Sequence, residues 1–337
     1  MSSTVTEQRT FAALAPSLQA NAQVEHGDWR DDFFKQGFYV FKNAVSREKA
    51  TDYYYAKALS WLQSFDNGFD LNNRETWVKE KLPQSFKNMY LGYCAAHEKF
   101  MWDARVEPGI VEPFEQLWGT NELLVSFDTF NVTLPKRKDD DFRPWPHVDQ
   151  APERHGLACV QGLLNLAPAG PEDGGLLLMV GSSALFEEYF TSFKARGRTD
   201  VDAKHYDFYM FEPEDIAWFE SKGCHQIKVN AEPGDLVLWD SRTIHHVAPI
   251  KSDVIRSVLY ICMTPANLAK PEDIQYKAEL FKRFEATTHW PHCNIWGHGK
   301  ARVNGEIDPL ERNEPLEKPV ITDQILRMAG VKFYADK

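Results

Sequence analysis

The residues best suited to chemistry in this chain are a histidine and an aspartate one residue apart, His147 and Asp149. In an extended strand, residues two apart point to the same face, so this imidazole and this carboxylate could approach one ion. A second histidine from elsewhere would complete the 2-His-1-carboxylate face that holds Fe(II) and leaves positions open for reaction. The pair alone is weak evidence, because the same pattern recurs at His205 and Asp207.

Two adjacent histidines, His245 and His246, follow the apolar run 236–239 and are candidates for the missing ligand. A Gly-Asp pair at 234–235 precedes them, and Arg256 begins another apolar run eleven residues (256 − 245) after His245. An arginine at the start of an interior strand needs an anionic partner, because an unpaired buried guanidinium is costly. A dicarboxylate cosubstrate would be such a partner, with its other end on the metal. The combination predicts an Fe(II) site that uses 2-oxoglutarate and O2, with His245 as the ligand and His246 as the alternative.

Each of these residues also has an ordinary structural interpretation. A single histidine is more often a satisfied structural residue than a ligand, and Arg256 alone could form a simple salt bridge. The pair His205 and Asp207 lies in charged, helical sequence without flanking strand residues, so we do not expect it to bind metal. A further cluster near the C-terminus lacks the paired spacing of a structural zinc site. Its members are His289, His292, Cys293 and His298.

Length and composition limit the classes of protein that the chain can belong to. Its 337 residues, 43% of them apolar, are enough to bury one large core or two modest ones. A formal net charge of −11 argues against a nucleic-acid partner, since affinity for phosphates comes chiefly from Lys and Arg. The basic cluster 136–138 is followed directly by three aspartates at 139–141.

Cysteine usage and hydropathy indicate the compartment. The five cysteines are odd in number and contain no CxxC pair, which predicts neither a disulfide framework nor a zinc ribbon and favours a reduced, intracellular setting. No run approaches the roughly 18 apolar residues of a membrane span, and the N-terminal residues do not resemble a secretory signal. We therefore expect a cytoplasmic protein with no membrane partner.

The elements that must position the site change character near residue 121. Before it, Asp28 is expected to cap a short helix, residues 38–41 to form a strand, and Ser46 to begin an amphipathic helix. Another helix is expected near 113–118. The aromatic residues of this half could line a pocket, but core packing is the default expectation for them. They are Trp77, Tyr90, Tyr93 and Trp102.

Between residues 121 and 265, short apolar runs alternate with strong turn signals, which indicates a sandwich or barrel and not a parallel α/β sheet. The expected strands are 123–134, 156–166, 174–180, 226–229, 236–239 and 256–263. Residues 184–224 interrupt them with charged, helical sequence, which predicts an insertion that covers one mouth of the barrel as a lid. We expect a flexible tail at 1–25 and a single domain at 26–337, with a C-terminal helical and irregular extension at 266–337.

These motifs together resemble those of the phytanoyl-CoA dioxygenase-like branch of the Fe(II)/2-oxoglutarate-dependent oxygenases. The resemblance runs from residues 37–40 to about Met263, and it is most specific at 147–149, 174–183, 234–245 and Arg256. It implies a mainly β fold with flanking helices, built on a double-stranded β-helix, the cupin-like jelly roll. Three groups of site residues follow from it: iron ligands at His147, Asp149 and His245, a cosubstrate clamp at Arg256, and cosubstrate contacts at Gln161 and Asn131.

The resemblance also implies an activity. It would be the oxidation of a small organic metabolite with O2, by hydroxylation, desaturation or rearrangement, with release of succinate and CO2, in secondary metabolism. Asp149 disfavours halogenation, because halogenating relatives carry a small residue in its place.

Two departures from the family pattern are visible. Gly181-Ser182-Ser183 stands where the family has Gly-Ser-His, and His246 occupies a position that is usually small. The alternatives that remain are a cupin-type metalloenzyme that does not use 2-oxoglutarate, a zinc hydrolase and a non-catalytic jelly-roll binding protein. The expected assembly is a monomer or a homodimer.

Overall fold

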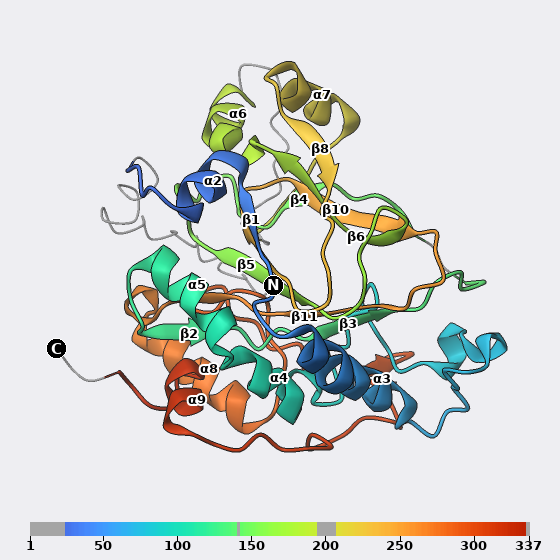
Figure 1. Ribbon diagram of the computed structural model, residues 1–337. Helices are drawn as coiled ribbons and strands as arrows, with labels where there is room; N and C mark the ends of the chain where they lie inside the picture. Colours follow the sequence, from blue (N-terminus) through green and yellow to red (C-terminus); the bar gives the residue numbers. More distant parts are fainter. Residues whose placement is uncertain (1–23, 140–141, 194–206, 335–337) are drawn as a thin grey trace, which may run out of the picture.

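The computed structural model describes residues 24–139, 142–193 and 207–334 (Figure 1). Most of the predicted N-terminal tail and the central part of the predicted lid therefore lie outside the described residues. The described chain contains two five-stranded antiparallel sheets. In order across the first sheet the strands are β1 (Phe38–Phe41), β9 (Leu236–Asp240), β5 (Val160–Asn165), β11 (Arg256–Tyr260) and β3 (Phe130–Thr133). Across the second they are β7 (Tyr209–Met210), β4 (His147–Val148), β10 (His245–Ile250), β6 (Asp173–Val180) and β8 (His225–Lys228).

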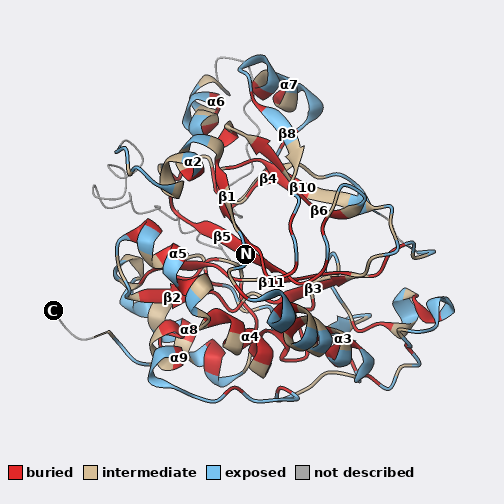
Figure 2. Ribbon diagram, in the orientation of Figure 1, coloured by how far each residue is buried: buried red, intermediate tan, exposed pale blue. Residues whose placement is uncertain are grey.

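The two sheets pack face to face through apolar side chains. Val237, Trp239 and Val258 of the first sheet share one buried cluster with Leu176 and Leu178 of the second. Leu176 and Leu178 of β6 therefore face the first sheet. Because side chains alternate between the faces of a strand, Leu177, which lies between them, points away from it. Most residues of the first sheet are buried (Figure 2).

Helices cover the outer faces of the sandwich (Figure 1). Below the first sheet lie α3 (Ala56–Gln63), α4 (Lys99–Arg105), α5 (Pro108–Trp118), α8 (Pro271–Lys282) and α9 (Asp323–Met328). A π-helical segment, Lys49–Tyr55, precedes α3, and α2 (Trp29–Gln36) begins at the predicted cap, where the Asp28 side chain accepts a hydrogen bond from the Arg30 N–H. None of the described helices is both long and apolar enough to span a membrane.

Four aromatic residues of the N-terminal half could, from the sequence, either line a pocket or pack in the core. Trp77, Tyr90, Tyr93 and Trp102 are all buried in the main apolar cluster of the chain. Ordinary packing, the default expectation, is therefore confirmed for these four.

The described part of the predicted lid packs on the outer face of the second sheet. Its helices are α6 (Phe186–Phe193) and α7 (Pro213–Ser221), which carry Phe186 and Phe219 into a cluster with Val148, Met179 and Ile244. Val148 points away from the neighbouring His147, so this contact is with the side of the sheet that faces away from the partner sheet. Whether residues 184–224 also cover a mouth of the sandwich stays a prediction.

Two expected strands are each divided in the structure. Residues 123–134 form β2 (Leu123–Val125) and β3, and residues 256–263 form β11 and the start of β12 (Met263–Pro265), with β2 paired to β12 and β3 to β11. A buried arginine contacts the chain between β2 and β3. The guanidinium of Arg105 donates a hydrogen bond to the carbonyl of Asp128 at 2.6 Å. That carbonyl is consequently committed to a helix side chain and not to a neighbouring strand. A short hairpin, β13 (Arg302–Val303) and β14 (Glu306–Ile307), lies in the C-terminal extension, which was expected to be irregular there.

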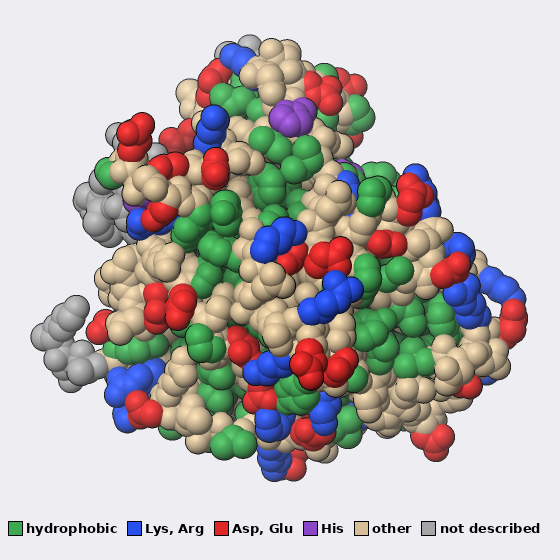
Figure 3. Space-filling view, in the orientation of Figure 1, with side chains coloured by type: hydrophobic (Ala, Val, Ile, Leu, Met, Phe, Trp, Pro, Cys, Tyr) green, Lys and Arg blue, Asp and Glu red, His purple; other side chains and the backbone are tan. Residues whose placement is uncertain are grey.

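The surface carries mixed charge on the face seen in Figure 3, where acidic and basic side chains alternate. The basic cluster at 136–138 is also paired with acidic residues. Lys136, Arg137 and Lys138 form ion pairs with Asp253, Asp139 and Glu75 respectively. Each cation of the cluster thus has an acidic partner.

A tight contact between two loops makes a prediction about stability. Gly234 has φ +95°, and a Cβ added to it would lie 2.1 Å from the carbonyl oxygen of Val45. Gly119 has φ +65° with nothing within 4 Å of such a Cβ. Replacing Gly119 with alanine should cost about 1 kcal/mol of backbone strain, and Gly234→Ala at least about 2 kcal/mol more. Denaturant unfolding of both variants measures the difference, and equal losses would contradict the proposed clash.

A buried histidine predicts how stability depends on pH. His97 is fully buried, with its Nε2 bonded to the carbonyl of Glu285 and its Nδ1 accepting from the Trp102 indole. Burial lowers the pKa of His97 to about 3, below its ordinary value of 6.5. Because the folded state resists protonation, this group's contribution to stability is complete above pH 6.5 and declines as the pH falls towards 3, at up to about 1.4 kcal/mol per pH unit.

The check is the free energy of unfolding measured from pH 7 to pH 4.5 for the wild type and for His97→Gln. The variant should be less stable at pH 7 but should lose stability less steeply as the pH falls. Parallel curves would show that His97 does not contribute to the acid sensitivity.

Candidate metal centre

The second sheet places two of the predicted ligands directly opposite each other. His147 on β4 and His245 on β10 are paired residues of neighbouring antiparallel strands, and their ring centroids lie 4.2 Å apart. Asp149 follows β4 and shares the face of His147. One ligand atom from each of the three residues lies within 4.8 Å of the other two. The structure therefore brings together the three residues predicted to bind metal.

Each histidine is oriented by a backbone carbonyl. The Nδ1–H of His147 donates to the Trp145 carbonyl at 2.9 Å, and that of His245 donates to the Thr243 carbonyl at 3.0 Å. This fixes the tautomer in which Nε2 carries a lone pair, the usual arrangement for a metal-binding imidazole. The two Nε2 atoms lie 3.5 Å and 3.2 Å from Oδ2 of Asp149.

Asp149 is held from two directions. Its backbone N–H donates to the carbonyl of Ser241, in the loop between β9 and β10, at 3.0 Å. Its Oδ2 accepts a hydrogen bond of 2.8 Å from the side-chain amide of Gln161, on β5 of the opposite sheet. Gln161 was predicted to contact the cosubstrate, and the structure shows its amide on the carboxylate ligand.

The electrostatics suit a cation. Burial would raise the pKa of Asp149, but at acidic pH, where the imidazoles of His147, His289 and His245 carry protons, they hold it well below its ordinary value. Burial lowers the pKa of His147, and the charge of His245 lowers it further. At neutral pH the site therefore presents an ionised carboxylate and an imidazole that stays unprotonated, which is the state that metal binding requires.

Aromatic rings surround the ligands. Trp145 stacks on His147 with a centroid distance of 3.7 Å and an interplanar angle of 10°, and Trp239 meets His245 at 5.5 Å and 61°. The ammonium of Lys87 lies over the Trp145 ring, 2.7 Å from its centroid. These contacts restrict both imidazole rings to one orientation.

The neighbouring histidine, His246, is not part of this group. It follows His245 on β10, where side chains alternate, and it is paired with Leu177, which lies between the two inward leucines of β6. Its Nδ1 is buried without a hydrogen-bond partner among the described residues. The structure thus favours His245 over His246 as the ligand.

Arg256 lies at the start of β11, only 4% exposed. Its guanidinium donates to Oδ1 of Asn131 at 3.2 Å, and within the described ranges no carboxylate lies at ion-pair distance from it. Asn131 also accepts from the Thr133 hydroxyl at 2.7 Å and donates to the Lys87 carbonyl at 3.0 Å. The structure therefore places Asn131 on the guanidinium of Arg256, with most of its own hydrogen-bonding capacity used by protein groups.

The two other patterns noted in the sequence do not form metal sites among the described residues. Asp207 forms a buried ion pair with Arg154 at 2.5 Å, which gives it a structural role, and His205 lies outside the described residues. In the C-terminal cluster, His292 contacts the Thr264 hydroxyl and Cys293 rests against His292. The five cysteines are free, as expected.

Two ionisable groups lie near the candidate ligands: Asp128, which sequence reasoning missed, and His289, which it had assigned only to the C-terminal cluster. Asp128 and His289 influence each other and Asp149 electrostatically, and burial raises the pKa of Asp128 to about 6. The Nε2 atom of His289 is buried without a hydrogen-bond partner in the described part of the chain. The spacing of neither residue relates it to His147, Asp149 or His245, so no signal in the sequence pointed to this proximity.

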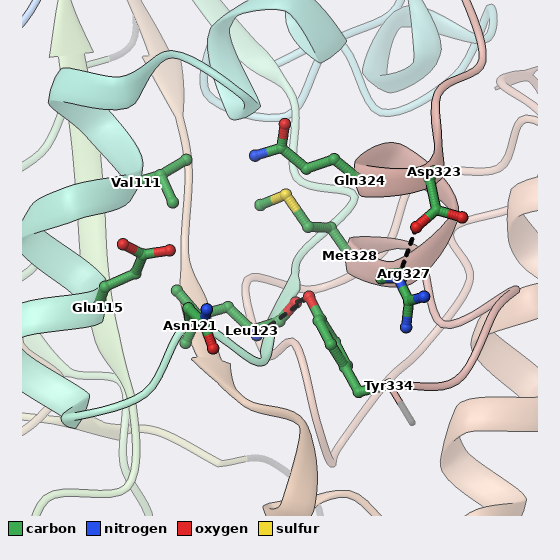
Figure 4. Close-up of a pocket in the computed structure, with 9 residues that line it drawn as sticks. All are labelled: Val111, Glu115, Asn121, Leu123, Asp323, Gln324, Arg327, Met328 and Tyr334. Atoms are coloured by element: carbon green, nitrogen blue, oxygen red, sulfur yellow. Dashed lines mark hydrogen bonds and ion pairs between the residues drawn. The ribbon is translucent and has the colours of Figure 1, made fainter. Parts of the chain in front are cut away.

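A separate cavity of about 210 Å³ lies between α5, the start of β2 and α9 (Figure 4). Its walls include Glu115, Asn121, Met328 and Tyr334, and Tyr334 is held by a hydrogen bond to the Leu123 carbonyl at 2.7 Å. It contains none of the predicted site residues, so the candidate metal centre and this cavity are distinct features.

The sequence of the chain is similar to those of known proteins. The sequence model of the phytanoyl-CoA dioxygenase family (PhyH) matches residues 33–258, a range that contains all three candidate ligands and Arg256. The Ava biosynthesis cluster protein O of Aspergillus versicolor is 44% identical over 301 residues, which cover 87% of this chain and 96% of that protein. A putative phytanoyl-CoA dioxygenase of Dictyostelium discoideum is 22% identical over 293 residues, covering 74% of this chain and 79% of that protein.

Among solved structures, GlcNAc Inducible Gene 2 (DUF1479) from Candida albicans superposes with a TM-score of 0.52 at 13% identity. The superposition covers 74% of this chain and 66% of that one. It indicates a shared fold.

Substitution of the two adjacent histidines tests the assignment of the ligand. Loss of a residue that hydrogen-bonds to a metal ligand typically lowers metal affinity roughly 10–100-fold. His245→Ala removes a ligand itself, so it should weaken Fe(II) binding by more than that. His246→Ala should leave Fe(II) affinity within about threefold of the wild type, because its ring lies outside the ligand group. Anaerobic metal titration of both variants measures this, and the reverse pattern would make His246 the ligand.

Proposed function

Because the chain belongs to the phytanoyl-CoA dioxygenase family, we propose that it is an Fe(II)- and 2-oxoglutarate-dependent oxygenase that oxidises a small organic metabolite with O2. The observation that carries the proposal is the convergence of His147, Asp149 and His245 in one largely buried site. Two imidazoles and one carboxylate on one side of an ion are the ligand set typical of non-haem iron oxygenases.

The residues present fit an iron ion. The Nε2 atoms of His147 and His245 and the carboxylate of Asp149 would hold it, since both Nδ1 atoms are already committed to backbone carbonyls. The Gln161 amide would orient the carboxylate, in the way that outer partners position metal ligands. With three protein ligands, positions on the ion are left for a cosubstrate and O2.

Arg256 would hold the far carboxylate of 2-oxoglutarate, and Asn131 would hold the guanidinium in place. A buried arginine without an acidic partner in the described chain has the charge that such a carboxylate requires. When bound, iron and 2-oxoglutarate together would supply the activation of O2 and the oxidative decarboxylation that yields succinate and CO2. The contribution of the protein is to bind, orient and shield the reacting groups.

We further infer that the sandwich is a double-stranded β-helix within a single domain at 26–337. The support is the strand order: β3, β4, β5 and β6 alternate between the two sheets, and β8, β9, β10 and β11 return through them in the opposite sense. This is the interleaving of two Greek keys that defines a jelly roll. Residues 184–224 and 266–337 would then be additions to that core.

The substrate class follows from the relative and from the walls of the site. The name of the Aspergillus relative refers to a biosynthesis cluster, which supports a role in secondary metabolism. Trp145 and Trp239 beside the ligands suit a partly apolar small molecule. Retention of Asp149 favours hydroxylation, desaturation or rearrangement over halogenation. We propose a cytoplasmic enzyme with no nucleic-acid or membrane partner, acting as a monomer or homodimer.

Formation of the ternary complex tests the proposal. Anaerobic protein with Fe(II) and 2-oxoglutarate should show the weak visible charge-transfer band of a chelated 2-oxo acid. His147→Ala should abolish the band, and Arg256→Ala should raise the Kd of 2-oxoglutarate at least about tenfold by removing its counter-charge.

Arg47→Ala is the matched control, because Arg47 forms an exposed ion pair with Glu232 at 2.9 Å and should leave the band unchanged. Absence of the band from the wild-type protein would contradict the proposed function.

A further inference from the structure

A second cation accompanies Arg256. Lys228, the last residue of β8, is paired with Leu177 of β6, and its ammonium lies beside Gly175 of the same strand. A Cβ built on Gly175 would be 3.6 Å from Nε of Arg256 and equally 3.6 Å from Nζ of Lys228. The two nitrogen atoms can therefore be no farther apart than twice that distance, with only a glycine between them.

The two charges repel each other, and no carboxylate of the described residues forms an ion pair with either of them. Burial lowers the pKa of Lys228 to about 8, and the charge of Arg256 contributes to the lowering. The negative charge of Asp173 raises the pKa of Lys228 in the opposite sense, but the carboxylate of Asp173 accepts a hydrogen bond from the Gly170 N–H. Within the described ranges, neither cation forms a salt bridge. A folded chain that holds two like charges together in a poorly solvated place has the electrostatics of an anion-binding site.

Unused hydrogen-bond donors strengthen this interpretation. Lys228 donates to the carbonyls of Ala169 and Val229 at 3.0 Å and 2.9 Å, which fixes the ammonium and leaves one of its three N–H groups. Arg256 has five N–H groups and donates one hydrogen bond within the described chain, to Asn131. Arg256 and Gly175 also border a small cavity that is lined otherwise mainly by apolar residues of the two sheets.

We propose that Lys228 and Arg256 together form a two-cation clamp for the far carboxylate of a dicarboxylate cosubstrate. This inference rests on the proposed function and assigns Lys228 to its cosubstrate site. Lys228 binds and positions the carboxylate; it takes no part in bond-making. Its consequence is selectivity, because a second cation favours a 2-oxo acid with two carboxylates over one with a single carboxylate.

The test uses the complete Fe(II)-loaded protein under anaerobic conditions, with the charge-transfer band as a readout of binding and not of turnover. The variants are Lys228→Met, which keeps the length of the side chain without its charge, and Lys228→Arg, which keeps the charge. Lys228→Met should raise the Kd of 2-oxoglutarate about tenfold, whereas Lys228→Arg should stay within about threefold of the wild type.

Two controls separate recognition of the carboxylate from structural damage. 2-Oxobutyrate can chelate the metal through the same end but lacks the far carboxylate, so its Kd should be equal in the wild type and in Lys228→Met. Lys222→Met removes an exposed lysine of the α7 C-terminus that pairs with Glu188, and it should change neither Kd.

The outcomes are distinct. Equal loss of affinity for both 2-oxo acids in Lys228→Met would show a structural role and overturn the clamp, and so would an unchanged Kd for 2-oxoglutarate. A wild-type protein without any band would instead contradict the proposed function, and the clamp with it.

Discussion

The candidate site depends on the register between β4, β10 and β6. His147 and His245 meet because they are paired residues of adjacent strands. Side chains alternate along a strand, so a slip of one residue in β10 would turn His246 inward and His245 outward. The register is maintained by apolar packing, in which Leu176 and Leu178 of β6 face the opposite sheet. The contacts that stabilise the sandwich therefore also determine which histidine faces Asp149.

The site also couples the two sheets. The candidate metal ligands lie on or next to the second sheet, whereas Gln161, Asn131 and Arg256 project from the first. The hydrogen bond from Gln161 to Asp149 crosses between them. Buried charges are costly unless they are paired or hydrogen-bonded, so the polar groups at this junction constrain each other. A movement of one sheet relative to the other would disturb the carboxylate of Asp149 and the proposed cosubstrate clamp together.

Much of this arrangement was predictable from local sequence patterns. The His-x-Asp spacing placed two ligands on one face, and the Gly-Asp motif before His245 favoured it over His246. Alternating apolar runs predicted most strands, and Asp28 correctly marked the start of α2. Patterns failed where tertiary contacts decide. Arg105 accompanies the division of the run 123–134. Residues 245–250, which were not among the expected strands, form the central strand β10. Asp128, His289 and Lys228 approach the site only through folding, so no spacing could identify them.

Anomalous diffraction at the iron absorption edge, from crystals grown anaerobically with Fe(II) and 2-oxoglutarate, tests the central claim most directly. The account predicts one dominant iron peak in contact with Nε2 of His147, Nε2 of His245 and the carboxylate of Asp149, with 2-oxoglutarate extending from it to Arg256. An iron peak at other side chains, such as His292 and Cys293, or no bound iron at these three residues, would contradict it.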